Sequence, residues 1–145
     1  VLGGGWSSRL FQEVREKRGL SYSVFASVGS FADCGTMSVY AATAPERLDE
    51  LRTVIDAQLH DLATNGPGQR ELDVARGGFE GATVLGLEDT GSRMARLATN
   101  VLFRDRVVGV DEYLDAVREV TAADVQRVLA EVLDGALAVS IVGPG

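Results

Sequence analysis

The feature that most constrains the fold is a change of apolar periodicity at Leu20. Small or apolar residues alternate with serines and aromatic residues over positions 22–28 and again over 37–42, as they do in half-buried strands. The turn-forming run Asp33-Cys34-Gly35 separates the two stretches. We therefore predict an antiparallel hairpin with its loop around residues 29–35.

A helical pattern precedes this hairpin. We predict one helix from about Arg9 to Gly19, because apolar residues recur there at i,i+4 spacing and a glycine commonly ends a helix. On its exposed side Glu13 is spaced to pair with both Arg9 and Lys17.

Five further helices are predicted after the hairpin. Pro45 suits a first helical position, and leucines at i,i+3/i+4 spacing extend the pattern until Asn65-Gly66-Pro67-Gly68 stops it. Thr121 and Asp124 resemble a capping box that opens the last helix. The other helices are predicted at about 69–87, 90–104 and 111–119, and the last one ends at residue 133.

The apolar run Ala136–Val142 predicts a third strand near the end of the chain. Strands followed by a run of helices are typical of an α+β fold, with a mostly antiparallel sheet and several helices packed on one face. We expect residues 1–145 to be a single, partial domain. Three strands are few for such a sheet, so we expect the first elements of the domain to be missing from this chain.

The amino-acid composition excludes some classes of function. The chain has 21 acidic and 14 basic residues, and its net charge of −7 repels a phosphate backbone, so we predict no nucleic-acid binding. Its apolar stretches are far shorter than the ~20 residues that a membrane helix needs. The single cysteine gives no sign of an oxidising compartment. We expect a cytoplasmic protein, although the chain opens at Val1 without an initiator Met and so leaves a lost targeting segment open.

The residue counts argue against a metal site. His60 is the only histidine and Cys34 the only cysteine, whereas zinc takes three or four ligands from His, Cys and carboxylates. Neither H-E-x-x-H nor H-x-x-E-H occurs. A serine or cysteine nucleophile needs an adjacent base, and only His60 could be a histidine base. We therefore expect no metal site and no nucleophilic catalyst, with His60 on a helix surface.

Three consecutive glycines, Gly3, Gly4 and Gly5, precede the first helix. Free amides at a helix start attract anions, so nucleotide binding is one interpretation. The run lacks the G-x-x-x-x-G-K-[ST] and G-x-G-x-x-G spacings. Glycine also lets the backbone approach a neighbour closely or turn sharply, and this second interpretation is favoured.

Arg15 and Tyr22 are the remaining pair of residues that could form a functional site. Arg15 lies near the end of the first predicted helix and Tyr22 just inside the next strand, so the turn at Gly19 brings them into one neighbourhood. Both side chains donate hydrogen bonds, as a grip on a carbonyl oxygen or an oxyanion requires. On the pattern alone, an exposed arginine and a half-buried strand tyrosine is the simpler interpretation.

Two consecutive stretches, Leu2–Phe11 and Val14–Tyr22, resemble a signature of the pitrilysin/insulinase family of zinc peptidases. Mitochondrial processing peptidase and its bacterial relatives belong to that family. The resemblance continues through Leu87–Met94 and Val120–Val125 to the final Val142-Gly143. It covers nearly the whole chain.

The resemblance implies two homologous α+β halves, of which the amino-terminal half carries H-x-x-E-H and binds zinc. This chain is similar to the carboxy-terminal half, which has no metal ligands. By resemblance, Tyr22 donates to the scissile carbonyl and its oxyanion, and Arg15 holds the substrate backbone. The loop near this site comprises Gly3, Gly4, Gly5, Ser7 and Ser8.

The implied function is that of a zinc-dependent metalloendopeptidase, with zinc in the full-length enzyme and none in this chain, which alone we expect to be inactive. The implied partners are a peptide or unfolded protein substrate and the homologous metal-binding half, in the same or another chain. A homodimer is a further candidate, by analogy with bacterial relatives. The alternative is a non-catalytic scaffold or partner subunit of the same family.

Overall fold

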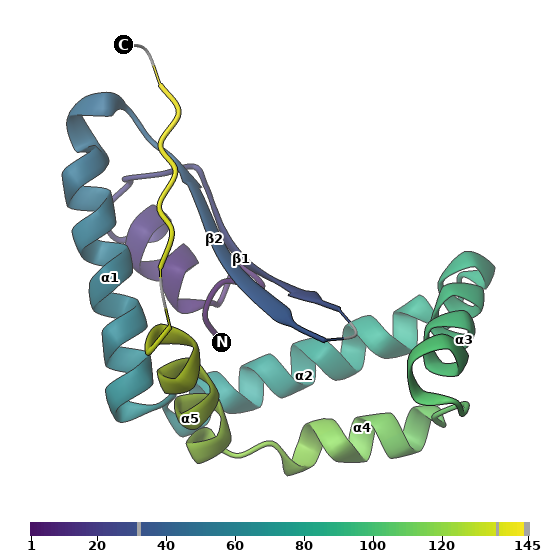
Figure 1. Cartoon of the computed structure of the whole chain (residues 1–145). Helices are drawn as coiled ribbons and strands as arrows, with labels where there is room; N and C mark the ends of the chain where they lie inside the picture. The colour runs from purple at the N-terminus through teal and green to yellow at the C-terminus, as the bar shows by residue number, and fades with distance from the viewer. Residues whose placement is uncertain (32, 136, 144–145) are drawn as a thin grey trace.

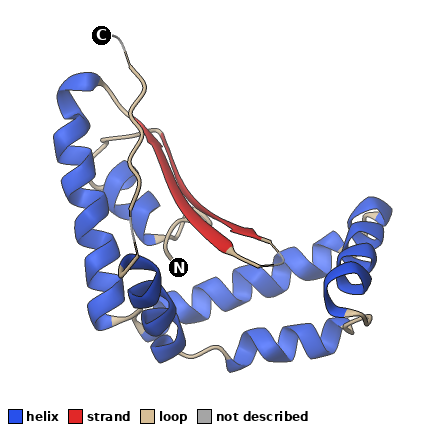
Figure 2. Cartoon of the chain, in the orientation of Figure 1, coloured by secondary structure: helices blue, strands red, loops and turns tan. Residues whose placement is uncertain are grey.

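The computed structural model describes residues 1–31, 33–135 and 137–143. Within these ranges the chain forms a two-stranded antiparallel sheet and a series of helices (Figures 1 and 2). The predicted order of one helix, a hairpin and five α-helices is confirmed, and so is the α+β class. The elements are the π-helix η1 (Phe11–Glu16), β1 (Ser23–Ser30), β2 (Gly35–Ala42), the 3-10 helix η2 (Pro45–Arg47), α1 (Leu48–Asn65), α2 (Gln69–Gly86), α3 (Thr90–Arg104), α4 (Val110–Glu119) and α5 (Ala122–Leu133).

The hairpin pairs β1 with β2 over the full length of both strands. Its connection is shorter than the predicted loop, because Gly29 and Ser30 stay in the ladder. The amide of Phe31 donates to the carbonyl oxygen of Cys34 over 2.9 Å and so closes the turn. The alternation of side chains then sends every second residue of each strand to the same face.

Helices cover one face of this hairpin, as Figure 1 shows for η1 and α1. Their apolar side chains meet the strands in one buried cluster, and α1 meets α5 in a second. The first cluster consists of Leu10, Val14, Leu20, Val24 and Leu51. The second consists of Leu59, Leu62 and Leu129. Within the described part of the chain, the opposite face of the hairpin carries no helix and is left open (Figure 1).

The helices α2, α3 and α4 extend away from this core. α2 runs past the tip of the hairpin, and α3 lies at the end of α2 that is farther from α1. α4 then runs back beside α2 (Figure 1). Arg118 on α4 donates to Glu80 on α2 over 2.7 Å. The rings of Phe79 and Tyr113 lie 6.2 Å apart between the same two helices. These contacts hold α2 and α4 together at a distance from the main core.

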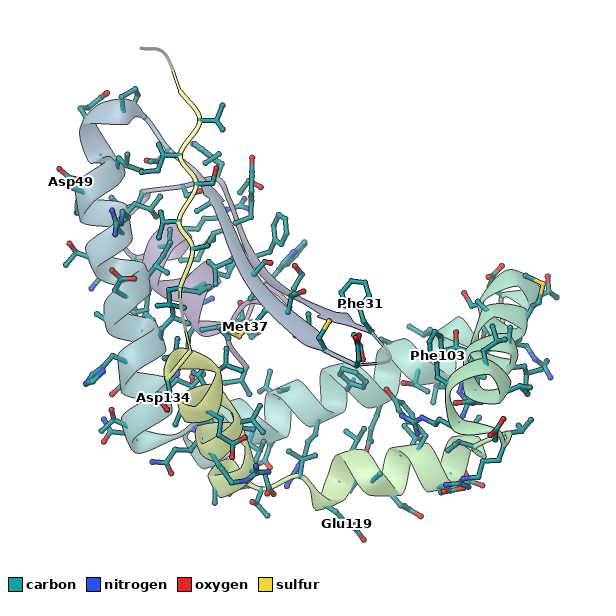
Figure 3. All side chains as sticks on the ribbon, in the orientation of Figure 1. Phe31, Met37, Asp49, Phe103, Glu119 and Asp134 are labelled. Carbon is teal, nitrogen blue, oxygen red and sulfur yellow. The ribbon has the colours of Figure 1, made fainter. Side chains whose placement is uncertain are left out.

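Because α2, α3 and α4 extend away from the core, much of the protein surface is exposed to solvent. The chain exposes 9928 Å², whereas a compact protein of 15.4 kDa exposes about 7,200 Å². Phe31 at the hairpin tip and Phe103 on α3 are both exposed (Figure 3). The other large apolar residues exposed on α3 are Met94, Leu97, Val101 and Leu102. Exposed apolar residues gathered on one helix in this way are typical of surfaces that pack against further protein.

The predicted third strand is wrong for the residues that the structure describes. Residues 137–143 form no strand, and Ala136 lies outside the described ranges. Every residue from 137 to 143 is exposed, so neither face of this segment is covered. A strand requires a neighbour that completes its backbone hydrogen bonds, and β1 and β2 pair only with each other within the described part of the chain.

Candidate functional site

The structure brings Arg15 and Tyr22 together. Arg15 lies on η1 and Tyr22 directly before β1, and Gly19 turns the chain between them with a φ of +57°. The Nη1 atom of Arg15 donates to the backbone oxygen of Tyr22 over 3.3 Å. The guanidinium carbon also lies 4.8 Å from the ring centre of Phe11 and 5.8 Å from that of Tyr22. Cation–π attraction to both rings therefore adds to the hydrogen bond.

The helix that carries Arg15 is a π-helix. The amide of Lys17 donates to the oxygen of Gln12, five residues back, over 2.9 Å. Turns of this kind are rare and occur often at functional sites. The sequence predicted an ordinary helix here, because apolar spacing does not distinguish a π-turn from an α-turn over so few residues.

Tyr22 is 88% exposed, in contrast to the half-buried strand position that the alternation predicts. The strand begins one residue later, at Ser23. Ser21 is buried instead, and its hydroxyl donates to the backbone oxygen of Ser23 over 2.8 Å. This local bond takes Tyr22 out of the pleat, and its phenol hydroxyl is left as a donor that faces solvent.

A shallow hollow of about 290 Å³ lies between the glycine loop, η1 and the start of β1. Ser7 and Ser8, predicted for the neighbouring loop, do not line it; Ser7 is exposed and Ser8 is buried. The lining residues are Gly3, Gly4, Gly5, Trp6, Phe11, Arg15, Tyr22, Ser23, Val24 and Phe25. The hollow thus combines the donors of the predicted pair with several aromatic rings, a combination that suits a peptide backbone and its side chains.

The glycine loop approaches β1 closely at one point. The amide of Ala26 donates to the oxygen of Gly3 over 3.1 Å. A Cβ atom on Gly3 would stand 2.4 Å from Ala26 N, whereas Gly4 and Gly5 have open space around the same position. The interpretation of the triplet as a close approach is confirmed for Gly3, and the other two glycines are free of this constraint.

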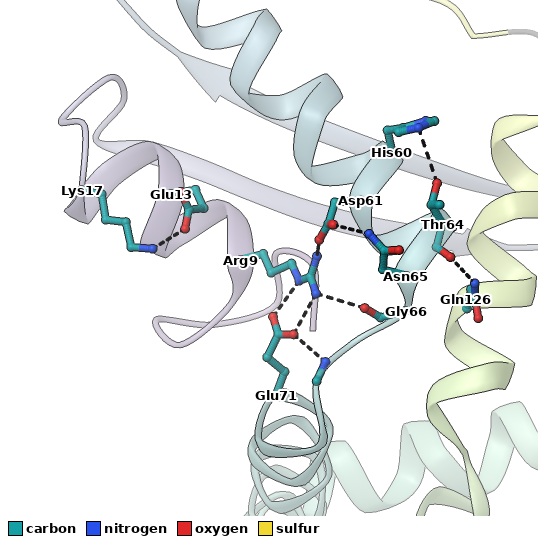
Figure 4. A network of polar contacts seen from close by, with 11 residues as sticks. Arg9, Glu13, Lys17, His60, Asp61, Thr64, Asn65, Gly66, Glu71 and Gln126 are labelled. Carbon is teal, nitrogen blue, oxygen red and sulfur yellow. Dashed lines mark hydrogen bonds and ion pairs between the residues drawn. The ribbon is translucent and has the colours of Figure 1, made fainter.

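Arg9 joins distant parts of the chain, and the partner predicted for it from spacing is wrong. It does not pair with Glu13, which binds Lys17 as predicted and also Arg18. Instead, the side chain of Arg9 is only 13% exposed and binds Asp61 and Glu71 (Figure 4).

Three elements meet at this guanidinium. Arg9 Nε donates to Glu71 Oε1 over 2.7 Å, and Nη2 donates to Glu71 Oε2 over 2.9 Å and to Gly66 O over 3.1 Å. Glu71 Oε2 also accepts from the amide of Gly68 over 2.9 Å. The hydrogen bonds from Arg9 lower the pKa of Glu71, and the bond to Glu71 raises the pKa of Arg9. The network fixes the start of η1 against the end of α1 and the start of α2.

The residues that the structure describes do not fit a zinc site. His60 is exposed on α1, with one ring nitrogen 3.5 Å from the Thr64 hydroxyl, and Cys34 is exposed near the hairpin turn. Over the ranges that the structure describes, no three His, Cys, Asp or Glu side chains gather as a metal site would require. Separately, no described helix is both long and apolar enough to cross a membrane.

The fold and the hollow define a class of α+β domain that presents hydrogen-bond donors and aromatic rings to solvent. Residues 1–79 match the family of the peptidase M16 inactive domain. The chain belongs to this family. The resemblance to the carboxy-terminal half of this family of zinc peptidases is therefore confirmed.

Curated relatives and solved structures agree with the family. An uncharacterized zinc protease of Streptomyces coelicolor is 43% identical over 99% of this chain and 31% of its own length. One from Bacillus subtilis is 37% identical over 88% of this chain and 31% of its own. The crystal structure of a peptidase M16 inactive domain from Pseudomonas fluorescens covers 90% of this chain and 31% of its own, with a TM-score of 0.80 and 24% identity, and so supports the fold. This chain spans about a third of the length of these relatives.

Proposed function

We propose that this chain is the carboxy-terminal region of a zinc-dependent metalloendopeptidase, and that it binds the peptide substrate. The observation that carries the proposal is the contact between Arg15 and Tyr22 beside a hollow that is open to solvent. The names of the curated relatives as zinc proteases support the reaction class.

Within this proposal the two side chains have different roles. Tyr22 donates a hydrogen bond from its phenol hydroxyl to the scissile carbonyl oxygen, which gains negative charge as the tetrahedral intermediate forms. A donor that binds this oxygen more strongly in the transition state than in the substrate accelerates the reaction. Arg15 donates a hydrogen bond through Nη1 to the backbone oxygen of Tyr22. Its other N–H groups can hold a carbonyl of the substrate backbone.

Zinc and the attacking water belong to a homologous metal-binding half in the same polypeptide or in another chain. The donor set of this chain fits no zinc, so the chain alone is inactive under this proposal. An exposed apolar face on α3, far from the hollow, offers a surface on which further protein can pack.

The experiment replaces Arg15 in the full-length polypeptide and measures cleavage of a quenched-fluorescence peptide. Arg15→Ala is expected to lower kcat/KM by about 10- to 100-fold, because charge-assisted bonds to the substrate are lost. The matched control is Arg52→Ala on the exposed side of α1. Equal activity of wild type and Arg15→Ala, with both proteins folded, would remove the proposed role.

A scaffold or partner subunit is the second candidate, because the matching family is described as an inactive domain. The two candidates differ in the remainder of the polypeptide. An active peptidase requires H-x-x-E-H there or in a partner chain, and its activity stops when a chelator removes the metal. Absence of that motif, together with undetectable cleavage of peptides, would favour the scaffold.

A further inference from the structure

The open face of the hairpin carries two large side chains among small ones. Val24 on β1 is buried against the helices, so the residues next to it point the other way. Within β1 and β2, the opposed pairs on this open face are Ser23 with Ala42, Phe25 with Tyr40, Ser27 with Ser38, and Gly29 with Thr36. Phe25 and Tyr40 therefore stand alone as an aromatic pair on a face without a charged residue.

The two rings form a stacked platform. Their centres lie 5.1 Å apart with an interplanar angle of 26°, and Phe25 and Tyr40 remain 45% and 51% exposed. Cross-strand aromatic pairs make only a modest contribution to the stability of a hairpin. Roughly half of each residue is still available for another apolar group, which is unusual surface to leave uncovered.

The platform is continuous with the proposed site. Phe25 lines the same hollow as Arg15 and Tyr22, and Trp6 lines it as well with 82% of its surface exposed. Phe25 lies three positions after Tyr22 in the sequence, which is about 10 Å along an extended chain. An extended peptide covers this distance in about three residues of its own.

We infer that the Phe25–Tyr40 platform binds a large apolar or aromatic side chain of the peptide whose carbonyl lies at Tyr22. This inference rests on the proposed function and adds the kind of side chain that the substrate must carry. The neighbours on the open face are Ser, Ala, Gly and Thr, which offer a charged side chain no partner. The bound side chain lies about three positions from the scissile carbonyl.

The test uses the full-length polypeptide and pairs of peptides that differ at one position, Phe against Ser, moved along the four residues on each side of the cleaved bond. At one position, wild type is expected to favour the Phe peptide by about 10- to 100-fold in kcat/KM. Phe25→Ser and Tyr40→Ser are expected to remove this preference, because KM rises much more for the Phe peptide than for the Ser peptide. Phe31→Ser, at the exposed hairpin tip, is the matched control.

The outcomes separate this inference from others. Equal losses on both peptides would overturn it, because they would show a role in hairpin stability alone. A change of oligomeric state in Phe25→Ser, seen by analytical ultracentrifugation without a change of peptide preference, would also overturn it in favour of a protein interface.

Failure of the proposed peptidase function can be distinguished from failure of this inference. If wild type cleaves neither peptide, binding of the same peptides with a fluorescent label decides the inference by anisotropy. Tighter binding of the Phe peptide, lost in Phe25→Ser, would support the platform without the chemistry. Equal binding of both peptides would contradict it.

Discussion

Gly3 and Ala26 are in backbone contact, with a 3.1 Å hydrogen bond from the amide of Ala26 to the oxygen of Gly3. The contact leaves no room for a side chain on Gly3, since a Cβ atom there would stand 2.4 Å from Ala26 N and 2.8 Å from Ala26 Cβ. It holds the glycine loop on the edge of β1, where the hollow beside Arg15 and Tyr22 begins.

We therefore predict that Gly3→Ala lowers the free energy of unfolding by about 2 kcal/mol, because the added methyl group forces the loop off β1. Gly4→Ala is the matched control, as its added atom meets open space. Its expected effect is within about 0.5 kcal/mol. Urea unfolding followed by circular dichroism measures both, and equal effects of the two substitutions would contradict the close approach.

Arg9 gives a second prediction. Arg9→Leu is expected to cost about 2 kcal/mol, because the partly buried Glu71 carboxylate and the Gly66 oxygen lose a charged donor. Lys17→Leu is the control, since Lys17 is exposed and such pairs contribute about 0–1 kcal/mol. Comparable losses in the two variants would show that Arg9 is an ordinary surface residue.

The same network predicts how stability depends on pH. Arg9 lowers the pKa of Glu71 below its ordinary value of 4.5. Hydrogen bonds from Asn65 and then from Arg9 lower that of Asp61. A carboxyl whose pKa is lower in the folded state stabilises the fold above the unfolded pKa, and this contribution is lost as the pH falls through the folded pKa.

Wild type is therefore expected to lose stability as the pH falls below about 4.5, and Arg9→Leu to lose less over the same range. Part of the dependence remains in the variant, since Lys17 lowers the pKa of Glu13 independently. Urea midpoints between pH 7 and pH 3 measure the difference. Parallel curves for the two proteins would refute the coupling of Arg9 to Glu71.

The helices and the hairpin were predictable because their signals are local. The spacing of leucines predicted α1, and the Thr121–Asp124 capping box predicted the start of α5, where both reciprocal bonds are present. Gly19 and Gly66 end their helices with φ values of +57° and +72°. The strand predicted at residues 136–142 does not form over the described positions 137–142, because strand pairing depends on a neighbour that local propensity does not reveal.

The site was only partly predictable, for a similar reason. The seven-residue spacing brought Arg15 and Tyr22 together because one turn at Gly19 connects them. The exposure of Tyr22 was missed, since alternation places it in phase with the buried Val24. The partners of Arg9 lie 52 and 62 residues away, a separation at which spacing carries no information.

The most direct measurement of the role proposed for Tyr22 is the kcat of Tyr22→Phe in the full-length polypeptide. Loss of one oxyanion donor is expected to lower kcat by about 100-fold, with KM little changed. Tyr113→Phe on α4 is the control for the same chemical change. A Tyr22→Phe protein that stays folded, retains zinc and keeps the kcat of wild type would contradict the role of this tyrosine in peptide hydrolysis.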